Sequence, residues 1–186
     1  MQQRPDKIIL GIDPGTNLMG FGVIDAGGNL PGFIDMGVID LKKGKGHYHK
    51  LRMIYDGTLG LLEAYHPDEV AIEAPFYGKN VQSMLKLGRA QGVAMAAVLS
   101  RDIPVHEYAP RKIKLSITSA GDASKEQVAA MLVRMFLLKE LPKNLDATDG
   151  LAAAVCHFYQ RAAGTVTKKG AGNWEEYIRK NPGRVK

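Results

Sequence analysis

The apolar run at residues 7–13 (KIILGID) is the feature that most restricts the fold of this chain. A strand of this composition is predicted to be buried on both faces, so its sheet must be covered by helices on both sides. The Pro14-Gly15 turn follows, and two further strands are predicted at residues 21–25 and 33–41. Three strands in succession favour an antiparallel meander at the start of the chain.

Helices and strands alternate in the rest of the chain. Short buried strands are predicted at residues 70–73 and 105–108. Helices are predicted from apolar spacing at residues 48–65, 81–99, 125–139 and 145–161, and a short one opens at Pro110. Ser124 with Gln127 forms a predicted capping box, and Asn144 is a predicted cap for the last helix. The whole order predicts an α/β protein with a mixed sheet, in which parallel crossovers extend the meander.

One domain is expected from 186 residues, at residues 1–163, followed by a basic, mobile tail at residues 164–186. The tail has six lysines and arginines against two glutamates, so it supplies +4 of the net charge of +6. Net charge is therefore weak evidence for a nucleic-acid partner. The single cysteine, Cys156, excludes an internal disulfide and a cysteine-rich zinc site and is expected in the core. The N-terminus has too little apolar length for a signal peptide or membrane span, which predicts a cytoplasmic protein.

Two groups of side chains leave alternatives open. A basic cluster surrounds residues 42–52 and includes His47, His49 and Lys50, and either a DNA backbone or solvent would suit it. Gly88, Gly92 and Ala96 form a flat stripe on one helix, which suits packing against the protein's own sheet or against another chain.

Four carboxylates occupy positions that suggest a metal site. Asp13 and Glu73 each end a buried strand, and they converge if the two strands are parallel neighbours. Asp146 and Asp149 lie three residues apart at the start of the last helix, on one face. Such a set with no Cys or His suits Mg²⁺ or Mn²⁺, and two cations could clamp a phosphate between them.

Three of the four carboxylates could also have a purely structural role, in a turn or a helix cap. Asp146 and Asp149 are what helix capping alone would supply, and Asp13 before Pro14-Gly15 suits a turn. Glu73 follows three apolar residues and has no evident turn or capping role. His157 lies about 16 Å along the helix from Asp146 and so is not expected to share the metal.

Several motifs in one register resemble the RuvC family of bacterial Holliday junction resolvases. They are GIDPG at 11–15, AIEAPF at 71–76, KNVQSMLKLGRAQGV at 79–93, YAPRKIK at 108–114 and DATDGLAAAVCH at 146–157. The resemblance implies a ribonuclease H-like fold, a five-stranded mixed sheet flanked by helices. It also implies an endonuclease that resolves Holliday junctions in DNA recombination and repair by paired symmetric nicks, with Asp13, Glu73, Asp146 and Asp149 as catalytic metal ligands.

The same resemblance assigns further roles. Lys114 and Lys125 match catalytic or DNA-contacting lysines, although solvated helix lysines are the common alternative. Phe76 resembles an aromatic wedge beside the crossover, and Tyr77, Lys79, Asn80 and Ser83 are expected to contact DNA. The resemblance also implies a homodimer formed through residues 81–99, and RuvA and RuvB as partners.

Three other functions compete with this one. An actin-like or sugar-kinase ATPase would need a second phosphate loop and an adenosine-binding half, for which this chain is too short. A non-catalytic junction-binding dimer predicts missing carboxylates, but all four are present. A ribonuclease H-like nuclease acting on RNA is disfavoured only by the match at residues 79–93.

Overall fold

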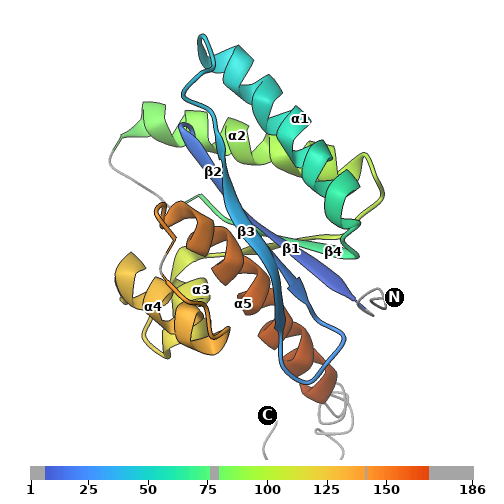
Figure 1. Ribbon diagram of the computed structural model, residues 1–186. Helices are drawn as coiled ribbons and strands as arrows, with labels where there is room; N and C mark the ends of the chain where they lie inside the picture. Colours follow the sequence, from blue (N-terminus) through green and yellow to red (C-terminus); the bar gives the residue numbers. More distant parts are fainter. Residues whose placement is uncertain (1–6, 76–79, 141, 168–186) are drawn as a thin grey trace, which may run out of the picture.

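A five-stranded sheet between two layers of helices forms the molecule, and the computed structural model describes residues 7–75, 80–140 and 142–167 (Figure 1). The strands are β1 (Ile8–Asp13), β2 (Leu18–Asp25), β3 (Gly32–Asp40), β4 (Glu69–Glu73) and β5 (Val105–Tyr108). Their order is β3-β2-β1-β4-β5, with β1 antiparallel to β2 and parallel to β4. The predicted meander with parallel crossovers is confirmed.

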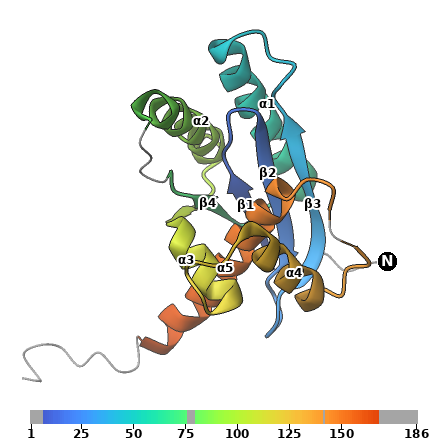
Figure 2. The ribbon, with the colours of Figure 1, turned by 90° about the vertical axis from the view of Figure 1, so that its left-hand side faces the viewer.

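The helices divide between the two faces of the sheet. The helices α1 (His47–Tyr65) and α2 (Val81–Leu99) cover one face, and α3 (Pro110–Thr118), α4 (Lys125–Met135) and α5 (Asp146–Thr167) lie on the other (Figures 1 and 2). Ala109 precedes Pro110, which opens α3 as predicted. None of the helices in the described part of the chain has the length and apolar character that a membrane span needs.

The alternation of side chains in the central strands places the acidic residues on the α5 side. In β1, Leu10 and Ile12 belong to the core under α1 and α2, whereas Ile9 belongs to the core under α5. Successive residues of a strand point to opposite faces, so Asp13 lies on the same side as Ile9. Ala71 of β4 also packs on the α5 side, so the glutamates at both ends of β4 share that face.

Helix α5 crosses the sheet at unusually close range. A Cβ added at Gly22 would lie 2.3 Å from Leu151 Cα, and one at Gly11 would lie 2.1 Å from the Gly150 oxygen. Side chains at these two positions would push the helix away from the sheet. The two glycines therefore allow the first turns of α5 to pack against the sheet, close to the ends of β1 and β4.

The boundaries of helices α4 and α5 differ from the prediction. Helix α4 ends at Met135 and not at residue 139, because Leu137 takes a left-handed conformation with φ of 52°. The amide of Leu138 then donates to the Val133 carbonyl (3.0 Å) and that of Leu137 to the Arg134 carbonyl (3.4 Å), which closes the helix. Glycine is the usual residue at such a position, so a leucine gave no signal of the stop.

The last helix begins later and ends later than predicted. Asp146 is its first residue, which makes Leu145, rather than the predicted cap Asn144, the residue before the first turn. The amides of Thr148 and Asp149 donate to the Leu145 carbonyl at 2.8 and 3.2 Å. The helix continues past Arg161 to Thr167 and so crosses the predicted domain boundary at residue 163. Residues 168–186, with Trp174, lie outside the described residues.

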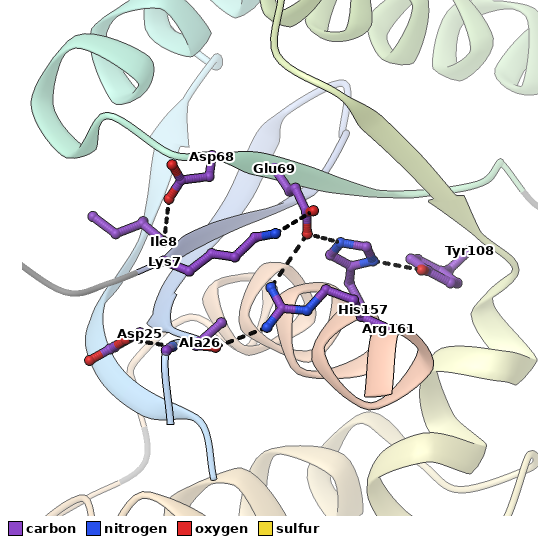
Figure 3. A network of polar contacts seen from close by, with 10 residues as sticks. Lys7, Ile8, Asp25, Ala26, Asp68, Glu69, Tyr108, His157 and Arg161 are labelled. Carbon is purple, nitrogen blue, oxygen red and sulfur yellow. Dashed lines mark hydrogen bonds and ion pairs between the residues drawn. The ribbon is translucent and has the colours of Figure 1, made fainter. Parts of the chain in front are cut away.

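A partly buried polar network joins β4 to α5 at the end of the sheet remote from Asp13 (Figure 3). Glu69 accepts hydrogen bonds from the Lys7 ammonium and from Nε2 of His157, both at 2.7 Å, and lies 3.7 Å from Arg161. The Tyr108 hydroxyl lies 2.7 Å from Nδ1 of His157. Burial lowers the pKa of His157, so the neutral ring donates through Nε2 and accepts from Tyr108. The network fixes the position of α5 along β4.

Candidate active site

Asp13 and Glu73 lie side by side at the carboxyl ends of neighbouring parallel strands. The register pairs Ile12 of β1 with Ile72 of β4, so the next residue of each strand is one of the two acids. Both side chains are on the α5 face, as the alternation in β1 and β4 requires. The predicted convergence of these two carboxylates is confirmed.

The first turn of α5 adds two more carboxylates. Ligand oxygens of Asp13, Asp146 and Asp149 all lie within 4.8 Å of one another. Glu73 lines the same cavity as Asp13 and Asp149. The Asp149 side chain is 13% exposed and that of Asp146 37%, so Asp149 lies deeper in the site. Three distant segments therefore bring four acids to one place, as predicted.

The electrostatics of this cluster oppose full ionisation. Burial, followed by the charges of Glu73 and Asp149, raises the pKa of Asp13 to about 8. Burial and the charge of Asp149 raise the pKa of Glu73 to about 7. Burial also raises the pKa of the Asp149 carboxyl, although Lys125 opposes this shift. A cation bound among these oxygens would remove the repulsion, which is the usual reason for such a grouping.

Lys125, the first residue of α4, partly balances the negative charge. Its ammonium hydrogen-bonds to Asp149 and lies 3.5 Å from Asp146. Burial disfavours the charged ammonium, but the hydrogen bond to Asp149 and the surrounding carboxylates outweigh burial and raise the pKa of Lys125. Lys114 of α3 lines the same cavity. Both predicted lysines are thus at the site, and neither is a remote surface lysine.

Several residues that shape the site were not predicted from the sequence. The cavity has a volume of about 100 Å³, and Ile113, Val128 and Ala152 from three different helices form its apolar wall. These side chains shield the acids from water and so contribute to the raised pKa values. Gln91 of α2 is buried, and its amide nitrogen lies 3.4 Å from the Glu73 carbonyl oxygen. A polar residue on the buried face of a predicted helix was the one available signal.

The predicted DNA contacts fall into two groups. Phe76, Tyr77 and Lys79 lie outside the described residues, so their predicted roles stay predictions. Asn80 caps α2, and its side chain accepts from the Ser83 amide at 3.1 Å. Asn80 and Ser83 are both exposed.

Two residues of α5 lie away from the cluster, as predicted. His157 bonds to Glu69 at the opposite end of β4 from Glu73. Cys156 is buried in the core.

Comparison with known proteins assigns the chain to a family. The family model described as crossover junction endodeoxyribonuclease RuvC matches residues 9–157. The chain belongs to the RuvC family. Among its members, the RuvC protein of Bacteroides fragilis is 61% identical over the full length of both chains. That of Porphyromonas gingivalis is 54% identical over 97% of this chain and 98% of its own.

Solved RuvC structures share the fold. Thermus thermophilus RuvC aligns with a TM-score of 0.74 and 29% identity, over 84% of this chain and 96% of that one. The same protein in complex with a Holliday junction substrate aligns with a TM-score of 0.73 and 28% identity, over the same shares of the two chains. The predicted ribonuclease H-like fold, with its five-stranded mixed sheet and flanking helices, is confirmed.

Proposed function

We propose that this protein is a metal-dependent endonuclease that resolves four-way DNA junctions by paired, symmetric nicks during recombination and repair. The gathering of Asp13, Glu73, Asp146 and Asp149 at one end of the sheet supports this proposal most strongly. Membership of a family described as crossover junction endodeoxyribonucleases narrows the substrate from phosphodiesters in general to the junction. The proposed cellular location is the cytoplasm.

The four carboxylates suit Mg²⁺, or Mn²⁺, and we propose two ions per site. Hard divalent cations prefer oxygen ligands, and no cysteine or histidine is among the residues that line the cavity. Asp13, Asp146 and Asp149 offer oxygens close enough to share one ion, and Glu73 beside them could hold a second one with Asp13. When bound, such ions activate an attacking water and stabilise the departing oxygen.

The side chains around the acids prepare the site for a phosphodiester. Lys125, positively charged and held by Asp149, places a cation at the mouth of the cavity, where charge develops on the phosphate. Lys114 adds a second positive charge from α3. The apolar wall keeps bulk water away, which strengthens both interactions. The roles proposed for the two lysines are therefore electrostatic and do not require a proton transfer.

Helix α2 supports the proposed homodimer. Val81, Leu85 and Leu99 are 66%, 52% and 56% exposed, and they lie on the same face of the helix as Gly88 and Gly92. Side chains added at the two glycines would meet nothing within 4 Å, so this stripe does not pack on the protein's own sheet. Contact between two such helices would relate two active sites by a two-fold axis, as two symmetric nicks require. RuvA and RuvB are proposed partners of that dimer.

The proposed function is tested by offering the protein three labelled substrates: a mobile four-way junction, a linear duplex and a structured RNA. Each is incubated with Mg²⁺ or with EDTA, and the products are separated on denaturing gels. Paired nicks on the junction in Mg²⁺ alone are expected. Cleavage of the RNA would favour the ribonuclease alternative. Junction binding without cleavage would favour the non-catalytic dimer, and undiminished cleavage in EDTA would reject the metal.

A further inference from the structure

A second cavity, lined in part by lysines, borders the turn that follows Asp13 and has no role in the chemistry described above. Its volume is about 420 Å³, and it is lined by residues from three segments: Thr16 and Asn17 from the turn after β1, His47 and Lys50 from α1, and Ser83 and Lys86 from α2. None of these residues is acidic. The cavity therefore combines two ammonium groups with neutral hydrogen-bonding groups.

The two lysines have no carboxylate partner in the described part of the chain. The Lys50 ammonium donates to the Thr16 carbonyl oxygen at 2.9 Å and to Oδ1 of Asn17 at 2.8 Å. An ammonium has three N–H donors, so one remains for a ligand. Lys86 is exposed and forms no ion pair with a described residue. An anion between the two lysines would relieve their mutual repulsion.

The helix ends around the cavity add to its positive potential. Helix α1 starts at His47 after Gly46, with no side-chain cap and no acidic residue in its first turn. Helix α2 also has no acidic residue in its first turn, which includes Ser83. Helix N-termini attract anions, and here two of them border one cavity. Nε2 of His47 is buried and has no hydrogen-bond partner among the described residues.

We propose that this cavity binds a backbone phosphate of the DNA substrate, on the strand that enters the acidic site. The inference rests on the proposed function and specifies how that function holds its substrate. Thr16 follows Asp13 by three residues, so their Cα atoms lie within about 11 Å of each other. The turn is therefore close to the acidic site, and the bound phosphate is expected a few nucleotides from the scissile one.

The hydrogen bonds of Lys50 also connect the proposed phosphate site to the turn that follows Asp13. The lysine holds the turn that directly follows Asp13, so a phosphate bound at its ammonium contacts the same segment that carries a proposed metal ligand. Lys86 and Ser83, three residues apart on α2, face the phosphate from the other side. The strand is thereby positioned by contacts to its backbone, which read no base sequence.

The test uses the Asp13→Asn variant, which is expected to bind the junction without cutting it, and measures junction affinity in Mg²⁺ over a range of salt concentrations. Adding Lys86→Met is expected to reduce the slope of log affinity against log salt by about 1, the value for one lost phosphate contact. Arg101→Gln is the matched control, because it removes one positive charge beyond the opposite end of α2, where Arg101 pairs with Glu63. The control is expected to leave the slope unchanged.

Neutral methylphosphonate linkages locate the contact. One such linkage is placed at each of the three positions on either side of the scissile phosphate. At one position, the neutral linkage is expected to weaken binding several-fold when Lys86 is intact. In the Lys86→Met variant, the linkage at that same position is expected to cause no further loss of affinity. The subsite would be overturned by a slope that Lys86→Met leaves unchanged, or by equal slopes for Lys86→Met and Arg101→Gln. It would also be overturned if the losses caused by the linkage and by Lys86→Met were additive at every position. Failure of the wild-type protein to cut an unmodified junction would instead reject the proposed function.

Discussion

Replacing Asp13 by asparagine is expected to stabilise the protein when no divalent cation is bound. Asparagine has nearly the same shape as aspartate but carries no charge, so the substitution removes one member of a buried, mutually repelling cluster. The pKa of Asp13 is about 8 in the folded protein against an ordinary value of 3.8. The folded state therefore holds this proton more tightly than the unfolded chain does, and ionisation of Asp13 destabilises the fold.

The magnitude follows from the pKa shift. At pH 7 the carboxyl is ionised in the unfolded chain, and keeping it protonated in the folded protein costs about 4 kcal/mol at most, at about 1.4 kcal/mol per pH unit above 3.8. Glu73, with a pKa of about 7, is half protonated at that pH and so repels less. A gain of about 2 to 4 kcal/mol remains for Asp13→Asn, and even the lower value raises Tm by at least about 4 °C in a domain of this length.

The sign of the pH dependence is also determined. Wild-type stability is expected to fall as pH rises from about 4 to about 8, because the pKa of Asp13 is raised in the folded state. Asp13→Asn lacks this loss, so the difference in Tm should widen across the same interval in EDTA. Saturating Mg²⁺ should narrow the difference in Tm between the two proteins, because the wild-type site binds the ion more tightly than the Asp13→Asn site does.

Thermal unfolding followed by circular dichroism at pH 5, 7 and 8, with EDTA or Mg²⁺, measures these differences. Asp122→Asn, a substitution at an exposed aspartate, is the control and should leave Tm unchanged. An Asp13→Asn protein that melts at or below the wild-type temperature in EDTA at pH 8 would refute the reasoning. The cluster would then be stable without a cation, and its acids would carry little mutual repulsion.

Three further predictions concern packing, the remote polar network and the site lysine. Gly22→Ala should lower the free energy of unfolding by about 3 kcal/mol, since its Cβ would lie 2.3 Å from Leu151 Cα. The control Gly60→Ala, whose Cβ would have nothing within 4 Å, should not lower it. Equal urea midpoints for the two variants would contradict this prediction. Burial opposes ionisation of Glu69, but hydrogen bonds from Lys7 and His157 lower its pKa from 4.5 to about 2, so the stability it contributes is lost as pH falls through that interval. Glu69→Gln should therefore cost about 1 to 2 kcal/mol at pH 7 and flatten acid unfolding between pH 4.5 and 2; an unchanged acid profile would count against it. Lys125→Met should slow single-turnover junction cleavage by about 10²-fold, and a rate within twofold of wild type would remove Lys125 from the site.

The acidic site was predictable because its members end or begin regular elements. Asp13 and Glu73 each follow a run of buried residues, and parallel strands bring their carboxyl ends to one edge of the sheet. Asp146 and Asp149 share one face of a helix start, so either a cap or a ligand pair fitted them. The proximity of both to Asp13 supports the ligand pair, and that proximity depends on how α5 crosses the sheet.

Contacts between distant side chains were not predictable in the same way. Glu69 meets His157 across 88 positions of sequence, and Lys50 meets Asn17 across 33. Nothing in the local pattern of either residue indicates its partner. The end of α4 was also missed, since a left-handed Leu137 closes the helix where the sequence offers no glycine. Local periodicity thus predicts elements, while tertiary packing selects the partners.

The central claim, that four carboxylates form one metal-dependent nuclease site, is tested most directly at Glu73. Glu73 is the acid with no turn or capping role, and its conservative variant Glu73→Gln keeps the shape of the side chain. Cleavage of a labelled mobile junction in Mg²⁺ and binding of the same junction are measured on one preparation. We expect undiminished binding with cleavage reduced by at least about 10²-fold. Cleavage of the junction by Glu73→Gln at the wild-type rate would contradict the claim.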